Sequence, residues 1–270
     1  MVDCRLEGKP SPLGEGTTQI ADDSPVSPLG HRHAISGELF RRMSGAKEVS
    51  VPGSIVHLGC GSVGSKIAMH LARAGHGPFL LVDKSAFSPH NAARHALTVL
   101  GEIPGQPKAS LLSREIRALG QQAKAEHVDI IDMCKSPKED FFPRDTRLIV
   151  DSTGSAAVRE MLISLAPDTV PGRVFHAALY ERGQIGIVAV EGRSRNPNIN
   201  DLVTLFWDER VSDEKLNSAF SSDKDALGRQ EVGLGCGSHT MVMPDSRVSL
   251  FAAGMAERAR GIFENHPNKK

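Results

Sequence analysis

The chain has 270 residues, and 40% of them are hydrophobic, which is enough to bury the core of one large domain with room for an appendage. Lysine and arginine total 32, as do aspartate and glutamate, so the formal net charge is zero and gives no reason to expect a nucleic-acid or membrane partner. No apolar run is long enough for a transmembrane helix, and the first residues lack the apolar core of a signal peptide, so we expect a cytoplasmic protein.

The beginning of the chain divides into an arm and the start of a domain. Residues 1–34 are rich in Pro, Gly, Ser and Asp and lack a hydrophobic period, which predicts a mobile N-terminal arm. We expect residues 35–270 to form the folded domain. The helical spacing of Leu39 and Met43, with Ser36 placed as a cap, predicts a short helix at its start.

A strand, a glycine-rich loop, a helix and a second strand then follow in order. They are expected at residues 54–58, at Gly59-Cys60-Gly61-Ser62-Val63-Gly64, at residues 65–75 and at residues 79–82. The second strand ends at Asp83. This order predicts the βαβ half of a Rossmann-like, doubly wound sheet.

The rest of the pattern continues a mostly parallel α/β sheet, with antiparallel strands added near its end. Helices are expected at 108–119 and 158–165, and strands at 126–131, 148–150, 174–178 and 185–190. Residues 192–231 are polar and weakly periodic, which predicts a crossover loop or insertion. A final helix is expected from Pro244 to about Phe263.

The glycine loop predicts a nucleotide site. Gly59 permits a tight turn, Gly61 lets a phosphate approach the backbone, and Gly64 lets helix and strand pack closely. Free amides near Ser62, at the helix N-terminus, would bind phosphate, and Asp83 would accept hydrogen bonds from ribose hydroxyls. At this point NAD and ATP fit equally well, and a glycine-rich turn without ligand is the alternative.

Three residues downstream favour ATP. Asn91 and Arg94 stand three apart, an arrangement for which a simple dehydrogenase has no use, and Lys108 opens the next predicted helix. The stretch from Gly59 to Leu97 resembles the ThiF/MoeB/ubiquitin-activating-enzyme superfamily. That family has a GxGxxG loop, an acid after the second strand, N-x-x-R followed by Gln or His, and a helix-starting lysine. The resemblance covers about residues 50–190.

The resemblance implies adenylation of a carboxylate by ATP and Mg²⁺. The family's usual substrate is the C-terminal Gly-Gly carboxylate of a ubiquitin-like or sulfur-carrier protein, and the products are an acyl-adenylate and pyrophosphate. Arg94 and Lys108 would stabilise the charge that develops at phosphorus, and Asn91 would orient phosphate or ribose. The family's helix-borne arginine, supplied by a partner subunit, would correspond to Arg41 or Arg42. We therefore expect a homodimer.

The resemblance also implies a magnesium ligand at Asp151. The segment Asp151-Ser152-Thr153-Gly154-Ser155 is similar to the family's D-x-T-D-N, whose second Asp helps to hold Mg²⁺. This chain departs from the pattern at Gly154, and again at Ser85, which stands in the second acidic place after Asp83. Among the matched acids, Mg²⁺ binding would therefore fall to Asp151, with substrate phosphates and waters completing the shell.

Cys236 lies in a glycine-rich segment after the polar region. Activating enzymes that hand on their substrate carry a nucleophilic cysteine in such a crossover, and nearby His239 would lower the thiol pKa or accept its proton. We therefore expect thioester transfer to Cys236, with a conjugating enzyme or a sulfur donor acting next. A small residue in a glycine-rich turn is the alternative for Cys236, and Cys60 is interpreted that way.

Three other functions remain open from the sequence. An NAD-dependent oxidoreductase would use the same glycine loop, but not the set of Asn91, Arg94 and Lys108. Activation of a small peptide would use the same chemistry on another substrate. A non-catalytic nucleotide-binding scaffold would explain the missing acids at Ser85 and Gly154.

Overall fold

The computed structural model of the chain describes residues 34–46, 53–98, 104–135, 141–220, 229–231 and 239–265. The arm expected at residues 1–34 lies outside this part, apart from Ala34. None of the described helices is both long and apolar enough to cross a membrane.

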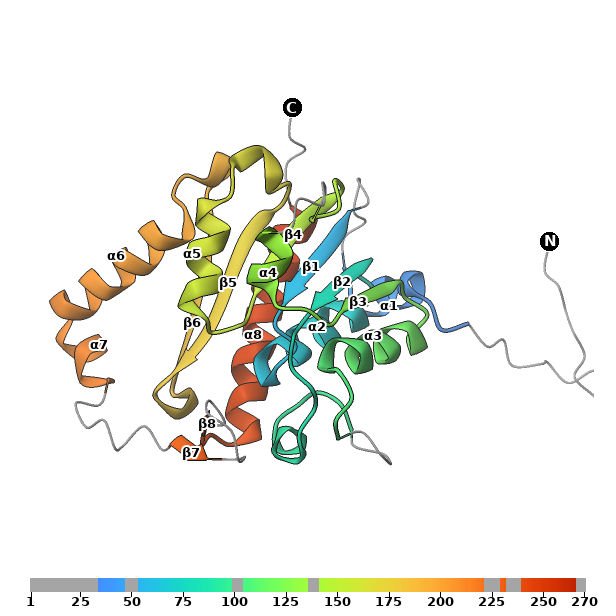
Figure 1. The fold of residues 1–270 in the computed structure, drawn as a ribbon, viewed down its shortest axis with the longest axis horizontal. Helices are drawn as coiled ribbons and strands as arrows, with labels where there is room; N and C mark the ends of the chain where they lie inside the picture. Colours follow the sequence, from blue (N-terminus) through green and yellow to red (C-terminus); the bar gives the residue numbers. More distant parts are fainter. Residues whose placement is uncertain are drawn as a thin grey trace, which may run out of the picture. The chain divides into compact units, whose positions relative to one another are not determined.

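The described strands form a six-stranded sheet in the order β3-β2-β1-β4-β5-β6 and a separate pair, β7 and β8 (Figure 1). Their bounds are β1 Ser54–Leu58, β2 Phe79–Val82, β3 Ala123–Glu126, β4 Thr146–Asp151, β5 Arg173–Tyr180, β6 Ile185–Val190, β7 Arg229–Glu231 and β8 His239–Met241. Neighbouring strands from β3 to β5 are parallel, and β6 runs antiparallel to β5. The predicted Rossmann-like, mostly parallel sheet is therefore confirmed.

The carboxyl ends of the central strands meet at one edge of the sheet. Leu58 of β1 pairs with Val82 of β2 on one side and with Asp151 of β4 on the other, and Asp151 pairs with His176 of β5. The strand order reverses between β1 and β4, and ligands of open α/β sheets bind in the crevice at such a point. The loop that follows Leu58 therefore opens at the position where this fold binds ligands.

Helices cover both faces of the sheet (Figure 1). Their bounds are α1 Gly37–Met43, α2 Ser62–Arg73, α3 Lys108–Ala118, α4 Ile130–Lys135, α5 Ala156–Ser164, α6 Ile199–Ser212, α7 Glu214–Ser218 and α8 Asp245–Glu264. α2, α3 and α8 cover one face, and α4, α5 and α6 cover the other. The alternation along β1 matches these two layers, since Ile55 faces the first core and Val56 the second.

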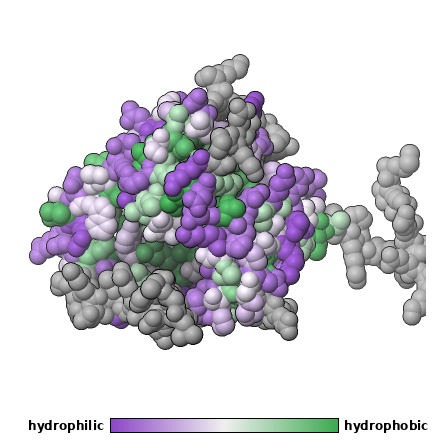
Figure 2. Space-filling model, in the orientation of Figure 1, coloured by the Kyte–Doolittle hydropathy of each residue, from purple (hydrophilic) through white to green (hydrophobic). Residues whose placement is uncertain are grey.

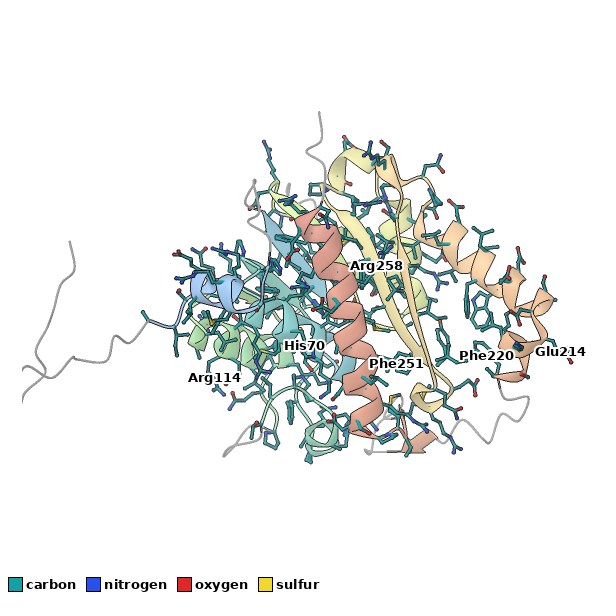
Figure 3. All side chains as sticks on the ribbon, turned by 180° about the vertical axis from the view of Figure 1, so that it is seen from behind. His70, Arg114, Glu214, Phe220, Phe251 and Arg258 are labelled. Atoms are coloured by element: carbon teal, nitrogen blue, oxygen red, sulfur yellow. The ribbon has the colours of Figure 1, made fainter. Side chains whose placement is uncertain are left out.

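The long helix α8 closes the first core. Figure 3, seen from behind, shows α8 lying across the sheet with Phe251 directed toward β5 and β6. The ring of Phe251 lies so close to Gly186 of β6 that a Cβ there would overlap it. An ion pair of 2.9 Å between Lys66 and Asp245 ties the start of α8 to α2. The C-terminal part of the chain therefore packs directly behind the glycine loop.

The strand predicted at residues 126–131 is wrong except at Glu126. β3 ends at Glu126, and α4 begins at Ile130. The carboxylate of Asp129 accepts a hydrogen bond from the Ile131 amide at 2.9 Å, which caps the first turn of a helix. The apolar run after Asp129 is too short for its period to distinguish a strand from a helix.

The loop expected at residues 192–231 is also wrong in part, because α6 and α7 lie within it. Asn198 and Asp201 form a capping box that begins α6. Leu202 packs against the second core, whereas Trp207 lies 5.7 Å from the ring of Tyr180 in an aromatic group beside it. Because α6 contacts two different surfaces, its apolar residues do not form the single stripe that sequence patterns detect.

Candidate functional site

The glycine loop leaves β1 and enters α2 without an intervening turn. α2 begins at Ser62, earlier than the sequence predicted, so the last residues of the loop are the first turn of the helix. Gly59 has φ +88°, a left-handed conformation that favours glycine. Its amide donates to the Val82 carbonyl at 2.9 Å. The loop is therefore attached to the ends of β1 and β2, and its helix amides face the carboxyl edge of the sheet.

Gly61 and Gly64 differ in what surrounds them. A Cβ built on Gly61 meets no atom within 4 Å, whereas a Cβ on Gly64 would overlap the Gly59 carbonyl oxygen and the Ser152 hydroxyl. The backbone at Gly61 is therefore open to an approaching group, and the backbone at Gly64 is packed against neighbouring strands. These are the two uses of glycine that a nucleotide-binding loop requires.

Asp83 holds the loop from the end of β2. Its two carboxylate oxygens accept hydrogen bonds from the amides of Cys60 and Ser85, each at 2.6 Å. Asp83 is largely buried, with 8% of its surface exposed. Each carboxylate oxygen has a second lone pair, which leaves the capacity to accept a ribose hydroxyl. The predicted acid thus lies beside the predicted loop.

Asn91 and Arg94 lie on and just after a short 3₁₀ helix, Pro89–Ala93. The Asn91 side-chain oxygen accepts from the Ser88 amide at 2.8 Å, so part of its hydrogen-bonding capacity caps this helix. The Arg94 guanidinium lies 3.4 Å from the Met243 carbonyl, next to the start of α8. Burial lowers the pKa of His90, and the charges of Lys108 and Arg94 lower it further.

His95 supports the loop, a role that the sequence did not reveal. Its Nδ1 accepts a hydrogen bond from the Leu97 amide at 3.2 Å, so Nε2 carries the proton and donates to the Cys60 carbonyl at 2.8 Å. Burial lowers the pKa of His95 to about 4, which keeps the ring neutral. The family pattern places Gln or His after the arginine, and both side chains can donate to a carbonyl.

Lys108 opens α3 and lies close to the loop. Its amide donates to the Ser85 carbonyl at 3.1 Å. Burial raises the pKa of the Cys60 thiol well above its ordinary value, Asp83 raises it further, and the Lys108 charge opposes both. The Lys108 backbone therefore lies beside the turn after β2, and its charge acts on the loop at Cys60. No acidic residue occurs in the first turn of α2 or α3.

Asp151 is the centre of a buried polar group under the loop. One carboxylate oxygen accepts from the amide and hydroxyl of Thr153 at 3.0 and 2.7 Å, and the other accepts from Nδ1 of His176 at 2.9 Å. Asp151 is 1% exposed. Nearby, His57 shares a 3.3 Å hydrogen bond with Ser152, and burial lowers the pKa of His57 to about 4 against the opposing charge of Asp151.

These contacts do not suit Asp151 to hold magnesium. Mg²⁺ sheds its water reluctantly and keeps several waters when it binds a protein carboxylate. A carboxylate with 1% exposure and three hydrogen bonds offers no room for such a shell. Within the described residues, no group of three His, Cys, Asp or Glu side chains is placed to hold a metal ion.

The structure describes Cys60 and Arg41, whereas Cys236 lies outside the described residues. Cys60 is fully buried, in agreement with its interpretation as a small residue of the loop. The Arg41 guanidinium donates to the Gly75 carbonyl of its own chain at 2.9 Å, at the end of α2. In this chain Arg41 therefore joins α1 to α2.

A cavity among the described residues lies elsewhere. It has a volume of about 750 Å³, and its lining includes Ser54, Phe79 and Ala123, the first residues of β1, β2 and β3. It therefore opens at the amino ends of the strands, opposite the glycine loop.

A second surface feature is a hollow with a hydrophobic floor. Figure 2 shows it over the lower parts of β5 and β6, as they are oriented in Figure 1.

Comparison with known proteins agrees with this geometry. A bovine (Bos taurus) protein, the adenylyltransferase and sulfurtransferase MOCS3, is 36% identical over 112 residues, which span 37% of this chain and 24% of that protein. The crystal structure of E. coli MccB with AMPCPP and MccA superposes with a TM-score of 0.51 at 15% identity, covering 80% of this chain and 57% of that one. TcdA (CsdL) gives a TM-score of 0.50 at 18% identity, covering 84% of this chain and 88% of that one.

The chain thus spans about a quarter of the bovine relative and little more than half of the MccB chain, and the structural likenesses establish the fold. The family assignment comes from the sequence model of the ThiF family, which matches residues 45–213. This range contains the glycine loop, Asp83, Asn91, Arg94, Lys108 and Asp151, all of which the structure places at or next to the carboxyl edge of the sheet. The chain belongs to the ThiF family.

Proposed function

We propose that the chain binds ATP on its glycine loop and transfers the AMP group to a carboxylate. The observation that carries the proposal is the open backbone of the glycine loop at Gly61, with Asp83 bonded to the Cys60 amide and the Lys108 end of α3 bonded to Ser85. A loop with open amides, an acid for the ribose and a nearby cation are the parts that adenylation by ATP needs. The E. coli MccB structures with ATP and AMPCPP, which share this fold, support the choice of nucleotide.

The proposed reaction is a displacement at the α-phosphorus of ATP. A carboxylate oxygen of the substrate attacks that phosphorus, the bond to the bridging oxygen breaks, and pyrophosphate leaves with the electron pair. Negative charge builds on the phosphoryl oxygens during this step, and Lys108 and Arg94 stabilise it. Asn91 orients the phosphate or ribose, and Asp83 binds the ribose hydroxyls. A magnesium ion brought by the nucleotide would neutralise part of the phosphate charge.

The proposed substrate is the C-terminal carboxylate of a ubiquitin-like or sulfur-carrier protein. The hollow over β5 and β6 supports this choice, because it offers an extended C-terminal tail an apolar surface (Figure 2). The bovine relative, described as an adenylyltransferase and sulfurtransferase, supports a place in sulfur transfer. A small peptide would use the same chemistry.

Exchange of pyrophosphate into ATP tests this proposal directly. The assay uses a panel of ubiquitin-like and sulfur-carrier proteins that end in Gly-Gly, each with a free or an amidated C-terminus. We expect exchange with a free carboxylate and none with the amide. Lys108→Met is expected to lower the exchange rate by about 100-fold, and the exposed Lys124→Met is the matched control.

Two outcomes would contradict the proposal. Equal exchange with amidated partners would remove the carboxylate as the acceptor. ATP binding without exchange on any member of the panel would favour the non-catalytic scaffold.

We further propose that Cys236 receives the activated carboxylate as a thioester before a conjugating enzyme or sulfur donor acts. The thiolate would attack the acyl-adenylate carbonyl and release AMP. A partner-dependent adduct on a non-reducing gel, sensitive to thiol and absent in Cys236→Ala, is the expected result. Cys134→Ala is the control, since burial raises the pKa of that thiol to about 11. An adduct that persists in Cys236→Ala would exclude the thioester.

We also propose that the chain is a homodimer. Exposed apolar side chains on α6 and α8, such as Val211 and Leu250, supply surface for such a contact. Sedimentation equilibrium is expected to give twice the chain mass of 29.0 kDa. A single species at the chain mass would contradict this.

A further inference from the structure

Three positions in this site correspond to places where the family pattern has acidic residues. The first is Asp151, where Thr153 and His176 already occupy the carboxylate. The oxygen near Thr153 accepts two hydrogen bonds and so uses both of its lone pairs. The other oxygen accepts from His176, which is itself 3% exposed. This carboxylate orders the end of β4 and its neighbour β5.

The second position is the turn after β4. Gly154 has φ +65°, and a Cβ built there meets no atom within 4 Å. The chain therefore has space at this point but no side chain. The next residue, Ser155, accepts a hydrogen bond from the Val158 amide at 3.4 Å and so caps α5.

The third position is the pair of residues after β2. The carboxylate oxygens of Asp83 accept from the amides of Cys60 and Ser85, and Ser85 contributes a hydroxyl where a second carboxylate would be needed. Hard cations such as Mg²⁺ are held in proteins chiefly by carboxylates. At all three positions, the described residues supply structural hydrogen bonds or empty space.

Positive charge is available at the same edge of the sheet. Arg94 ends the short 3₁₀ helix Pro89–Ala93 that follows β2, and Lys108 begins α3, where its amide donates to the Ser85 carbonyl at 3.1 Å. Burial lowers the pKa of His90, and the charges of both residues lower it further. The 12-residue helix α2 directs its N-terminus toward the same place, without an acid in its first turn. Cationic side chains and helix amides are the groups that bind phosphate without a metal.

From this arrangement we infer that the chain binds nucleotide phosphates through Lys108, Arg94 and the amides of α2, with none of the described side chains ligating magnesium. The inference rests on the ATP-binding part of the proposed function. It also assigns Asp151 a positioning role, in which it orders the Thr153 turn next to the loop. ATP affinity should therefore be insensitive to magnesium.

Calorimetric titration with ATP, in excess Mg²⁺ and in excess EDTA, tests the inference. We expect the two dissociation constants of the wild-type protein to agree within about threefold. Binding that is more than about tenfold weaker in EDTA would overturn the inference and leave the proposed function standing. No ATP binding in either buffer would overturn both.

Two substitutions of Gly154 test the inference independently. Asp and Asn both tolerate a left-handed backbone, and the open space around position 154 accepts either side chain. Gly154→Asp is expected to add a ligand and to make ATP bind about tenfold more tightly in Mg²⁺ than in EDTA. Gly154→Asn, which matches its shape without the charge, is expected to behave like wild type. An Asp variant without this gain would contradict the account of position 154.

A substitution of Asp151 distinguishes a magnesium ligand from a residue that positions the Thr153 turn. Asp151→Asn keeps the shape of the side chain and removes its charge. We expect this change to lower the thermal midpoint but to leave the ratio of the two dissociation constants unchanged. A ratio that moves by more than about tenfold would make Asp151 a metal-linked residue.

Discussion

Gly61 and Gly64 stand three residues apart in one loop, yet a side chain at each would meet opposite surroundings. Gly61 faces open space, and Gly64 is enclosed by the Gly59 carbonyl and Ser152. The first position therefore affects what the loop can bind, and the second affects how β1 and α2 fit together. His95 adds a third contribution, because its Nε2 fixes the Cys60 carbonyl just before Gly61.

Alanine substitutions should separate binding from folding at these two glycines. Gly61→Ala places a methyl group where a phosphate would approach, so we expect at least a tenfold loss of ATP affinity and an unchanged thermal midpoint. Gly64→Ala forces backbone atoms apart and should destabilise the fold by about 1–3 kcal/mol or more. Calorimetry and thermal unfolding of both variants measure the difference, and equal effects on stability would contradict it.

At the scale of the elements, local signals predicted the part of the chain around the loop. β1 and β2 lie where the apolar runs placed them, and Asp83 lies beside the loop because parallel neighbours end at one edge. The pairing of Asp151 with His176 could not be predicted, since it depends on the register between β4 and β5. No local pattern in a sequence encodes that register.

The sequence patterns also did not predict helices α4 and α6. α4 begins at an Asp129 cap that an apolar run obscured, and α6 has apolar residues on more than one side. For the same reason, the sequence placed Asp151 correctly at a strand end but could not show that its carboxylate is occupied. Contacts made across the sheet determine whether a side chain can still bind a ligand.

A buried ion pair joins the end of β6 to the end of α5. Arg195 donates to Glu191 at 3.0 Å and to the carbonyls of Leu162 and Leu165 at 2.7 and 3.1 Å. Glu191 is 1% exposed. Removing Arg195 therefore leaves a buried carboxylate without its partner.

Arg195→Ala is expected to lower the free energy of unfolding by about 3–5 kcal/mol. The double variant Arg195→Met with Glu191→Leu should recover a large part of this loss, because no charge is left buried. Urea unfolding of the wild type and of both variants checks the result. A double variant less stable than Arg195→Ala would show that the pair itself stabilises the fold.

At the scale of the whole molecule, buried neutral histidines link stability to pH. His57 and His95 both have a pKa of about 4, well below the ordinary value near 6.5, mainly because of burial. The unfolded chain takes up protons as the pH falls through 6.5, and the folded chain does so only near 4. Their contribution to stability is therefore complete above pH 6.5 and is lost as the pH falls toward 4.

Between pH 6.5 and 4, each of these histidines should reduce the free energy of unfolding by up to about 1.4 kcal/mol per pH unit. His95→Gln keeps a donor for the Cys60 carbonyl and removes one titrating group, so its slope should be shallower than that of the wild type. Urea unfolding at several pH values in this window measures both slopes. Identical slopes for the two proteins would contradict the account of His95.

We propose that the glycine loop of this ThiF-family chain binds ATP, although the geometry of the loop alone would also suit NAD. Calorimetric titration of the wild-type protein and of Gly61→Ala with ATP and with NAD tests it most directly. The account predicts that ATP binds to the wild type, that Gly61→Ala loses this binding, and that NAD binds at least about tenfold more weakly than ATP. Tighter binding of NAD than of ATP, or ATP binding that Gly61→Ala leaves unchanged, would contradict it.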